Sequence, residues 1–218
     1  MSFPFDLTLL EVIFIALLLF VSSAVQGVLG FGFAVIASPI IVQINPNLVP
    51  QLLALLGLPI ALRVFFREKE GVDLSKVKPL IVGRLVGGPI GLLLLLNLSE
   101  KYLSIAVGVI VLVAGLGSFF GWVINRSNLN SFLAGTFSGI FGMVAAVGGP
   151  PIALLYRNTK SEQFRPSLNS VFSIGILITL SLLLLSGNLF MDHLLLFVLF
   201  LPFVLVGVRV STSIFSKF

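Results

Sequence analysis

Long apolar segments follow one another along almost the whole chain, and they limit its fold more than any other feature. They fall at about 7–30, 33–44, 48–66, 78–97, 102–124, 130–142, 145–156, 168–187 and 193–215. A helix needs about 20 apolar residues to cross the roughly 30 Å hydrocarbon core of a bilayer. Only 10% of the residues are charged, against about 25% in an average soluble chain. The sequence therefore predicts an all-α integral membrane protein, not a cytosolic enzyme or a secreted domain.

Two of these segments are too short to cross a bilayer as continuous helices. Residues 33–44 and 145–156 contain about 12 residues each, which span only about 18 Å at the helical rise of 1.5 Å per residue. A Gly-rich stretch adjoins each of them, and such a break frees backbone polar groups that cannot face lipid. We therefore expect broken or re-entrant helices whose breaks line protein or water.

Basic residues are unevenly distributed over the loops, and they predict the orientation in the membrane. If the spans alternate, one side receives Arg63, Arg67, Lys69, Lys76, Lys78, Arg126, Arg157, Lys160, Arg165 and Lys217. The other side receives Lys101 as its only basic residue, together with Asp6, Glu100 and Asp192. Loops rich in Lys and Arg stay in the cytoplasm. We expect a multi-pass protein of the cytoplasmic (inner) membrane with its N-terminus outside and its C-terminus in the cytoplasm.

A weak internal repeat relates the two halves of the chain. The Gly-x-x-Gly motif at Gly27 recurs at Gly139, and the Pro-Ile pair at Pro39 recurs at Pro151, both at an offset of 112 residues. Glycine is also common in membrane helices because small residues let backbones approach closely. Packing alone, however, does not require breaks at matching places beside short helices. The repeat therefore favours two related structural units.

The repeat predicts a single membrane transporter domain, residues 1–218, with three parts. They are a first repeat at about 7–97, a linking span at about 102–124 and a second repeat at about 128–215. One linking span inverts the second repeat relative to the first. The predicted fold is a polytopic membrane helix bundle of two inverted-topology repeats. Inverted repeats with interrupted helices are typical of secondary transporters, whose substrates bind near the breaks.

The breaks also suggest the charge of the substrate. Helices that begin at a break direct their N-terminal amides and the positive end of their dipole into the cavity, which favours an anion. Polar residues near the breaks complete the candidate site. The candidate substrate-binding residues are Gln26, Gly30, Phe31, Gly32, Phe33, Ser38, Gln51, Gly142, Gly148, Gly149, Pro150, Pro151, Arg165, Asn169 and Ser173. With no Cys and one His, we expect no metal site and no cofactor.

A few charged residues lie within the spans. Arg84 and Arg209 are near the predicted cytoplasmic ends of their helices, so we expect their side chains to extend to the interface. The alternative is that they line an inner vestibule and attract anions. Glu11 lies near the outer interface, where a proton-coupling role is the less favoured reading, and His193 is expected to be interfacial.

Several short motifs, in this order and spacing, give the chain a family resemblance. They are 27–32 (GVLGFG) with Pro39, 71–73 (GVD), 87–91 (GGPIG), 138–142 (SGIFG), 148–151 (GGPP) and 164–167 (FRPS). In these motifs the chain resembles the TauE/SafE family of sulfite and organosulfonate anion transporters. The resemblance implies transport of sulfite, sulfoacetate or a related organosulfonate. Residues 30–34 (GFGFA) stand where that family often has a run of three glycines, and Phe33 there would narrow or reshape this half of the site.

Four functions are to be weighed for such a sequence. The most favoured is a secondary transporter of a small sulfur-containing anion, and an anion channel or uniporter for another oxyanion or carboxylate is the alternative. A membrane enzyme would need an acid–base or metal constellation that one His and few intramembrane acids do not offer. A purely structural subunit would not need paired breaks. The expected partners are a small anion, the lipid bilayer and a second copy in a possible homodimer, without nucleic acid.

Overall fold

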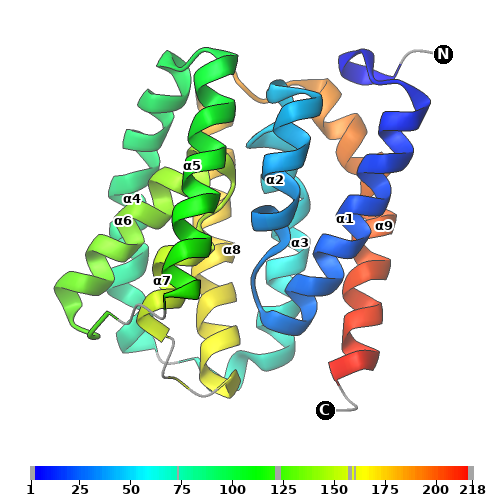
Figure 1. Cartoon of the computed structure of the whole chain (residues 1–218). Helices are drawn as coiled ribbons and strands as arrows, with labels where there is room; N and C mark the ends of the chain where they lie inside the picture. The colour runs from blue at the N-terminus through cyan, green and yellow to red at the C-terminus, as the bar shows by residue number, and fades with distance from the viewer. Residues whose placement is uncertain (1–2, 73, 121–123, 157–158, 160, 216–218) are drawn as a thin grey trace.

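The computed structural model describes residues 3–72, 74–120, 124–156, 159 and 161–215. Within these residues the chain forms nine α-helices, three short 3-10 turns and no strand (Figure 1). The helices are α1 (Leu9–Leu29), α2 (Phe33–Ile44), α3 (Gln51–Glu68), α4 (Leu74–Asn97), α5 (Glu100–Phe119), α6 (Asn128–Ala145), α7 (Gly149–Tyr156), α8 (Ser161–Leu185) and α9 (Met191–Phe215). The predicted all-α bundle is confirmed.

Six helices in the described part of the chain are long and apolar enough to cross a membrane. They are α1, α3 with the turn before it, α4, α5, α8 and α9. Outward-facing Leu, Val, Ile and Phe side chains cover much of the bundle, as lipid contact requires. The chain is therefore a multi-pass membrane protein.

The short helices lie in two hairpins that point in opposite directions. In Figure 1, α1 descends from the end that holds the N-terminus, and α2 turns back toward that end. The α6–α7 hairpin enters from the opposite end and returns there. This arrangement agrees with two inverted units that contain broken helices. The boundaries of the repeats stay a prediction.

Helix–helix contacts through glycine hold each side of the bundle together. A Cβ on Gly83 would overlap the carbonyl oxygen of Phe132, and one on Gly87 would overlap that of Thr136, so the backbones of α4 and α6 touch. Likewise, a Cβ on Gly207 of α9 would overlap the Phe20 carbonyl oxygen of α1. These glycines serve the close packing typical of membrane helices.

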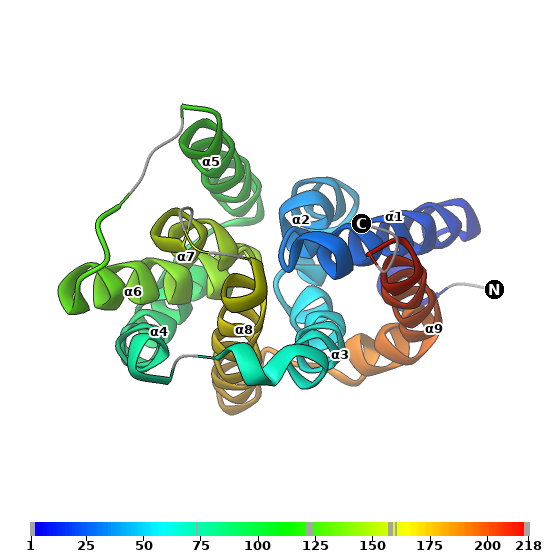
Figure 2. The same cartoon turned by 90° about the horizontal axis from the view of Figure 1, so that it is seen from below.

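The helices form two groups, with a boundary that runs through the middle of the molecule. Seen from below in Figure 2, α1, α2, α3 and α9 lie on one side and α4, α6, α7 and α8 on the other, with α5 along the edge. The larger hydrophobic cluster belongs mainly to the first group and also includes side chains of α5. The smaller cluster joins α4, α7 and α8. The two hairpin tips meet at this boundary.

Two ionisable residues discussed above have structural roles. Glu11 forms a capping box with Thr8 at the start of α1: its carboxylate accepts the Thr8 backbone N–H at 2.8 Å. His193 is fully buried, where its Nδ1 accepts the Phe190 N–H at 3.1 Å and its Nε2 lies 2.9 Å from the Asn47 carbonyl oxygen. His193 therefore ties the start of α9 to the turn after α2.

Candidate functional site

The break between α1 and α2 is built by two glycines and one glutamine. Gly30 (φ +86°) and Gly32 (φ +118°) adopt left-handed conformations that favour glycine. The Gly30 N–H donates to the Gln26 carbonyl oxygen at 2.7 Å, which ends α1. The side-chain Oε1 of Gln26 then accepts the Phe33 N–H at 3.0 Å and caps the start of α2. The break therefore lies where the sequence predicted it and has a defined geometry.

The break between α6 and α7 has a different construction. Ala146 ends α6 in a left-handed conformation (φ +58°), and the Ser138 hydroxyl donates to the Gly148 carbonyl oxygen at 2.5 Å. Pro150 and Pro151 follow Gly149 in the first turn of α7. Proline suits this turn because its missing N–H is not needed by the helix. It also has no N–H to offer a ligand, so α7 presents fewer amides than an ordinary helix start.

The two breaks line one central cavity of about 50 Å³. Seven of the predicted site residues contribute to it: Gln26, Phe31, Gly32, Phe33, Gly142, Gly148 and Gly149. Side chains of α3, α4 and α8 complete the wall, so both groups of helices take part. The segments contact each other closely, because a Cβ on Gly149 would lie 3.4 Å from the ring of Phe31.

Arg84 supplies the only charged side chain in the lining of this cavity, as far as the described residues go. It is 3% exposed, and its Nε and Nη1 have no hydrogen-bond partner among the described residues. Its guanidinium carbon lies 5.9 Å from the ring centre of Phe172. No carboxylate in the described part of the chain pairs with it. A buried, uncompensated cation therefore faces the cavity.

Glycines make the space that the Arg84 guanidinium occupies. A Cβ on Gly142 would lie 2.8 Å from its Nη2, and one on Gly148 would lie 3.2 Å from its Nη1. A Cβ on Gly175 would overlap its Nε and Cζ. Elements far apart in the sequence thus provide a cradle for one side chain.

The expectation that Arg84 reaches the membrane interface was wrong. Arg84 is ten residues from the start of α4, which places it roughly 15 Å along the helix axis. An Arg side chain at that depth cannot reach water along the helix, and α6 and α8 cover the face of α4 that carries it. By contrast, Arg209 of α9 is exposed. The predicted span began at residue 78, after the observed start of α4 at Leu74, so the sequence placed Arg84 closer to the interface than it lies.

Gln26 offers a second donor to the cavity. Because its Oε1 accepts the Phe33 N–H, its side-chain nitrogen is directed elsewhere and has no partner among the described residues. An amide nitrogen can donate two hydrogen bonds. Gln26 and Arg84 together therefore suit a ligand that carries negative charge and several acceptor oxygens.

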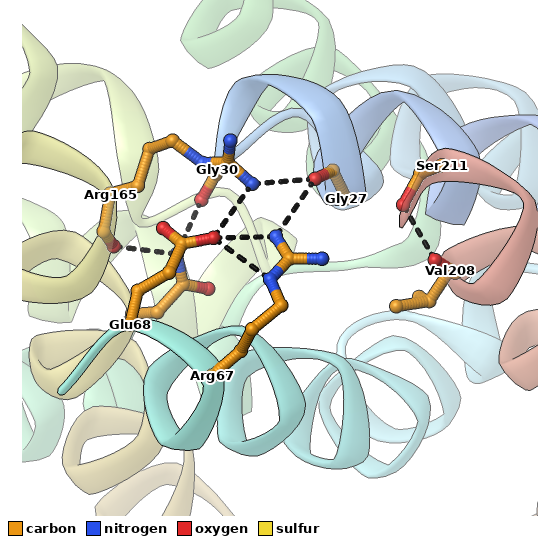
Figure 3. A network of polar contacts seen from close by, with 8 residues as sticks. Gly27, Gly30, Arg67, Glu68, Arg165, Val208 and Ser211 are labelled. Carbon is orange, nitrogen blue, oxygen red and sulfur yellow. Dashed lines mark hydrogen bonds and ion pairs between the residues drawn. The ribbon is translucent and has the colours of Figure 1, made fainter. Parts of the chain in front are cut away.

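Two other predicted residues lie beside the tip of the α1–α2 hairpin, away from the cavity (Figure 3). Arg165 Nη2 donates to the Gly27 carbonyl oxygen at 2.7 Å, and Asn169 Nδ2 donates to the Gly30 carbonyl oxygen at 2.9 Å. Gly30 itself, also a predicted site residue, lies on this side of the tip. The Arg165 and Asn169 side chains stabilise the break from the side opposite the cavity.

The remaining predicted residues are also outside the cavity lining. Ser173 donates to the backbone oxygen of Asn169 at 2.8 Å, and Gln51 donates to that of Asn188 at 3.2 Å. Ser38 is buried within α2. Pro150 and Pro151 line a separate, mainly apolar crevice of about 320 Å³ next to α5 and α6.

Sequence reasoning missed Phe172 and Thr179 as lining residues, and it did not single out Gly175 behind Arg84. The described residues contain no group of three or more His, Asp or Glu that could hold a metal.

Comparison with known proteins gives one match. The model of a family described as sulfite exporter TauE/SafE matches residues 14–218. No curated protein and no solved structure matches the chain.

Proposed function

The chain belongs to the sulfite exporter TauE/SafE family, and from this premise we propose that it is a secondary transporter of a small sulfur-containing anion. The anion, such as sulfite or a small organosulfonate, binds in the central cavity between the two broken hairpins. Arg84 provides the positive charge and Gln26 an amide donor. The glycines at the two breaks let the anion approach the backbone.

One observation carries this proposal: Arg84 is buried without a counter-charge where the two breaks meet. An unpaired buried charge is costly, since removing one partner from a buried ion pair costs about 3–5 kcal/mol. Ionisable residues inside a membrane are rare and usually mark a substrate path. A bound oxyanion would supply the missing charge and accept hydrogen bonds from the guanidinium.

The distribution of charge supports a proposed orientation in the cytoplasmic membrane. In Figure 1 the α3–α4 connection, the start of α6, the start of α8 and the end of α9 lie at the same end of the bundle. This end, called the basic end below, holds Arg67, Lys69, Lys76 and Arg126. Arg157, Lys160 and Lys217 lie outside the described residues. The positive-inside rule assigns the basic end to the cytoplasm.

Flux measurements in proteoliposomes test the proposal. Arg84→Gln should reduce the uptake of radiolabelled sulfite by about 100-fold or more, which corresponds to roughly 2.7 kcal/mol of lost anion binding. Arg209→Gln is the matched control, because Arg209 lies in a membrane-spanning helix but is exposed. Monodisperse elution of both variants shows that they fold. Wild-type flux in Arg84→Gln would refute the proposed site.

The same vesicles distinguish a carrier from a channel. With the membrane potential clamped at zero, a carrier preloaded with unlabelled sulfite should accelerate the uptake of labelled sulfite by exchange, whereas a channel should not. Parallel assays with sulfoacetate, sulfate and acetate identify the anion class. Exchange of acetate alone would contradict the sulfur-anion assignment.

A further inference from the structure

A cluster of three charged side chains lies behind the α1–α2 tip (Figure 3). The Glu68 carboxylate, on the last residue of α3, is 2.6 Å from Nη2 of Arg67 and 3.1 Å from Nη2 of Arg165. Arg165 comes from α8 and is almost fully buried, whereas the side chain of Glu68 is 20% exposed. One carboxylate therefore holds two guanidinium groups from different helices together.

The same arginines hold the end of α1. The last four carbonyl oxygens of a helix have no partner within it and need donors from elsewhere. The Gly27 carbonyl oxygen receives Arg165 Nη2 at 2.7 Å and Arg67 Nη2 at 3.5 Å. The C-terminal end of α1 is thus attached to α3 and α8 through the cluster that Glu68 organises.

The tip separates this cluster from the central cavity. Phe31 and Gly32 line the cavity, while the adjacent Gly30 faces the opposite way, since a Cβ on it would lie 2.8 Å from Cγ of Arg165. Both the end of α3 and the start of α8 lie at the basic end of the bundle (Figures 1 and 2). The tip and the cluster therefore stand between the cavity and the solution at that end.

We infer that Glu68 is a gating residue: its ion pairs with Arg67 and Arg165 keep the α1–α2 tip closed over the basic end of the cavity. This inference rests on the proposed transport function. When the carboxylate leaves, two like charges remain side by side and repel each other, and the tip loses the arrangement that holds Gly27. Because the Glu68 side chain is partly exposed, its carboxylate can leave the arginines for water, and the gate opens when it does.

Thiol labelling tests the gate without any transported anion. The chain has no cysteine, so one introduced at Ala54, a buried residue in the cavity lining, is the only reactive thiol. A membrane-impermeant thiol reagent is added to vesicles from the basic end or from the opposite end. In the Ala54→Cys background, Glu68→Gln should raise the labelling rate from the basic end about tenfold, equivalent to about 1.4 kcal/mol in favour of the open state.

The control variant is Glu70→Gln, which removes an exposed acid two residues away. It should leave the rate unchanged, and Glu68→Asp should give a rate between those of wild type and Glu68→Gln. Equal rates in Glu68→Gln and Glu70→Gln, or faster labelling from both ends, would overturn the inference. A second reporter, Val35→Cys, repeats the test at another lining position.

Failure of the gate and failure of the transport proposal give different results. If the chain carries no sulfur anion but Glu68 gates the cavity, sulfite flux is absent while one-sided labelling still increases. If the proposed transport is correct but Glu68 is only structural, Arg84→Gln abolishes flux while Glu68→Gln leaves labelling unchanged.

Discussion

Replacing Arg84 by Met should stabilise the empty protein while it abolishes anion binding. Arg84 is 3% exposed, and its Nε and Nη1 have no partner among the described residues. The charge is therefore desolvated without compensation. Replacing buried ionic groups by apolar ones of similar volume is often stabilising by about 1–4 kcal/mol. Met also has a flexible, unbranched side chain that can fill the cradle between Gly142, Gly148 and Gly175.

Binding of the anion should also stabilise the wild-type protein against unfolding. An anion at a hundred times its dissociation constant stabilises the folded state by about 2.7 kcal/mol. It should therefore bring the wild type close to the stability of empty Arg84→Met, and it should not stabilise the variant at all. For a chain of this length, each kcal/mol corresponds to about 2–4 °C in melting temperature.

The assay is thermal unfolding of purified protein in detergent, with sulfite, sulfate or acetate at matched ionic strength. Arg209→Met is the control for removing an exposed positive charge. If Arg84→Met melted below the empty wild type, Arg84 would have a structural role and the reasoning would be refuted. A sulfite shift in Arg84→Met equal to that of the wild type would place the anion elsewhere.

Two further substitutions test the geometry around the cavity. Gly175→Ala should displace the Arg84 guanidinium, because the new Cβ would overlap its Nε. Sulfite binding should weaken about tenfold, or about 1.4 kcal/mol. The control Gly108→Ala, with no atom within 4 Å of its Cβ, should bind sulfite like the wild type. Gly30→Ala should destabilise the protein by about 1–2 kcal/mol, since its φ of +86° is costly for any residue with a Cβ. Equal melting temperatures for Gly30→Ala and Gly108→Ala would contradict that strain.

The sequence predicted the breaks because their chemistry is local. Gly30 and Gly32 are needed where φ is positive, and the prolines after Gly149 mark the start of a helix. Such features depend on neighbouring residues and hardly on the rest of the fold. The positions of both hairpin tips therefore follow from the order of residues along the chain.

The role of Arg84 could not be predicted in the same way, because it depends on what packs against α4. Gly142 and Gly175, on two other helices, determine that a guanidinium fits there. Similarly, Arg165 and Asn169 contact the break between α1 and α2, but from the side of the hairpin tip that faces away from the cavity. Which side of a tip a residue occupies is set by the packing of whole helices.

The unpaired charge of Arg84 has a consequence for how voltage acts on the protein. Moving one elementary charge across 100 mV involves about 2.3 kcal/mol. With a singly charged anion bound, the cavity is neutral; when empty, it carries one positive charge. If the cavity opens alternately to the two sides of the membrane, the membrane potential acts on the step in which the empty protein returns to its starting state. With a doubly charged anion bound, the cavity carries one negative charge, so the membrane potential also acts on the step in which the loaded protein exchanges sides. The voltage dependence of flux would thus report the protonation state in which the anion is carried.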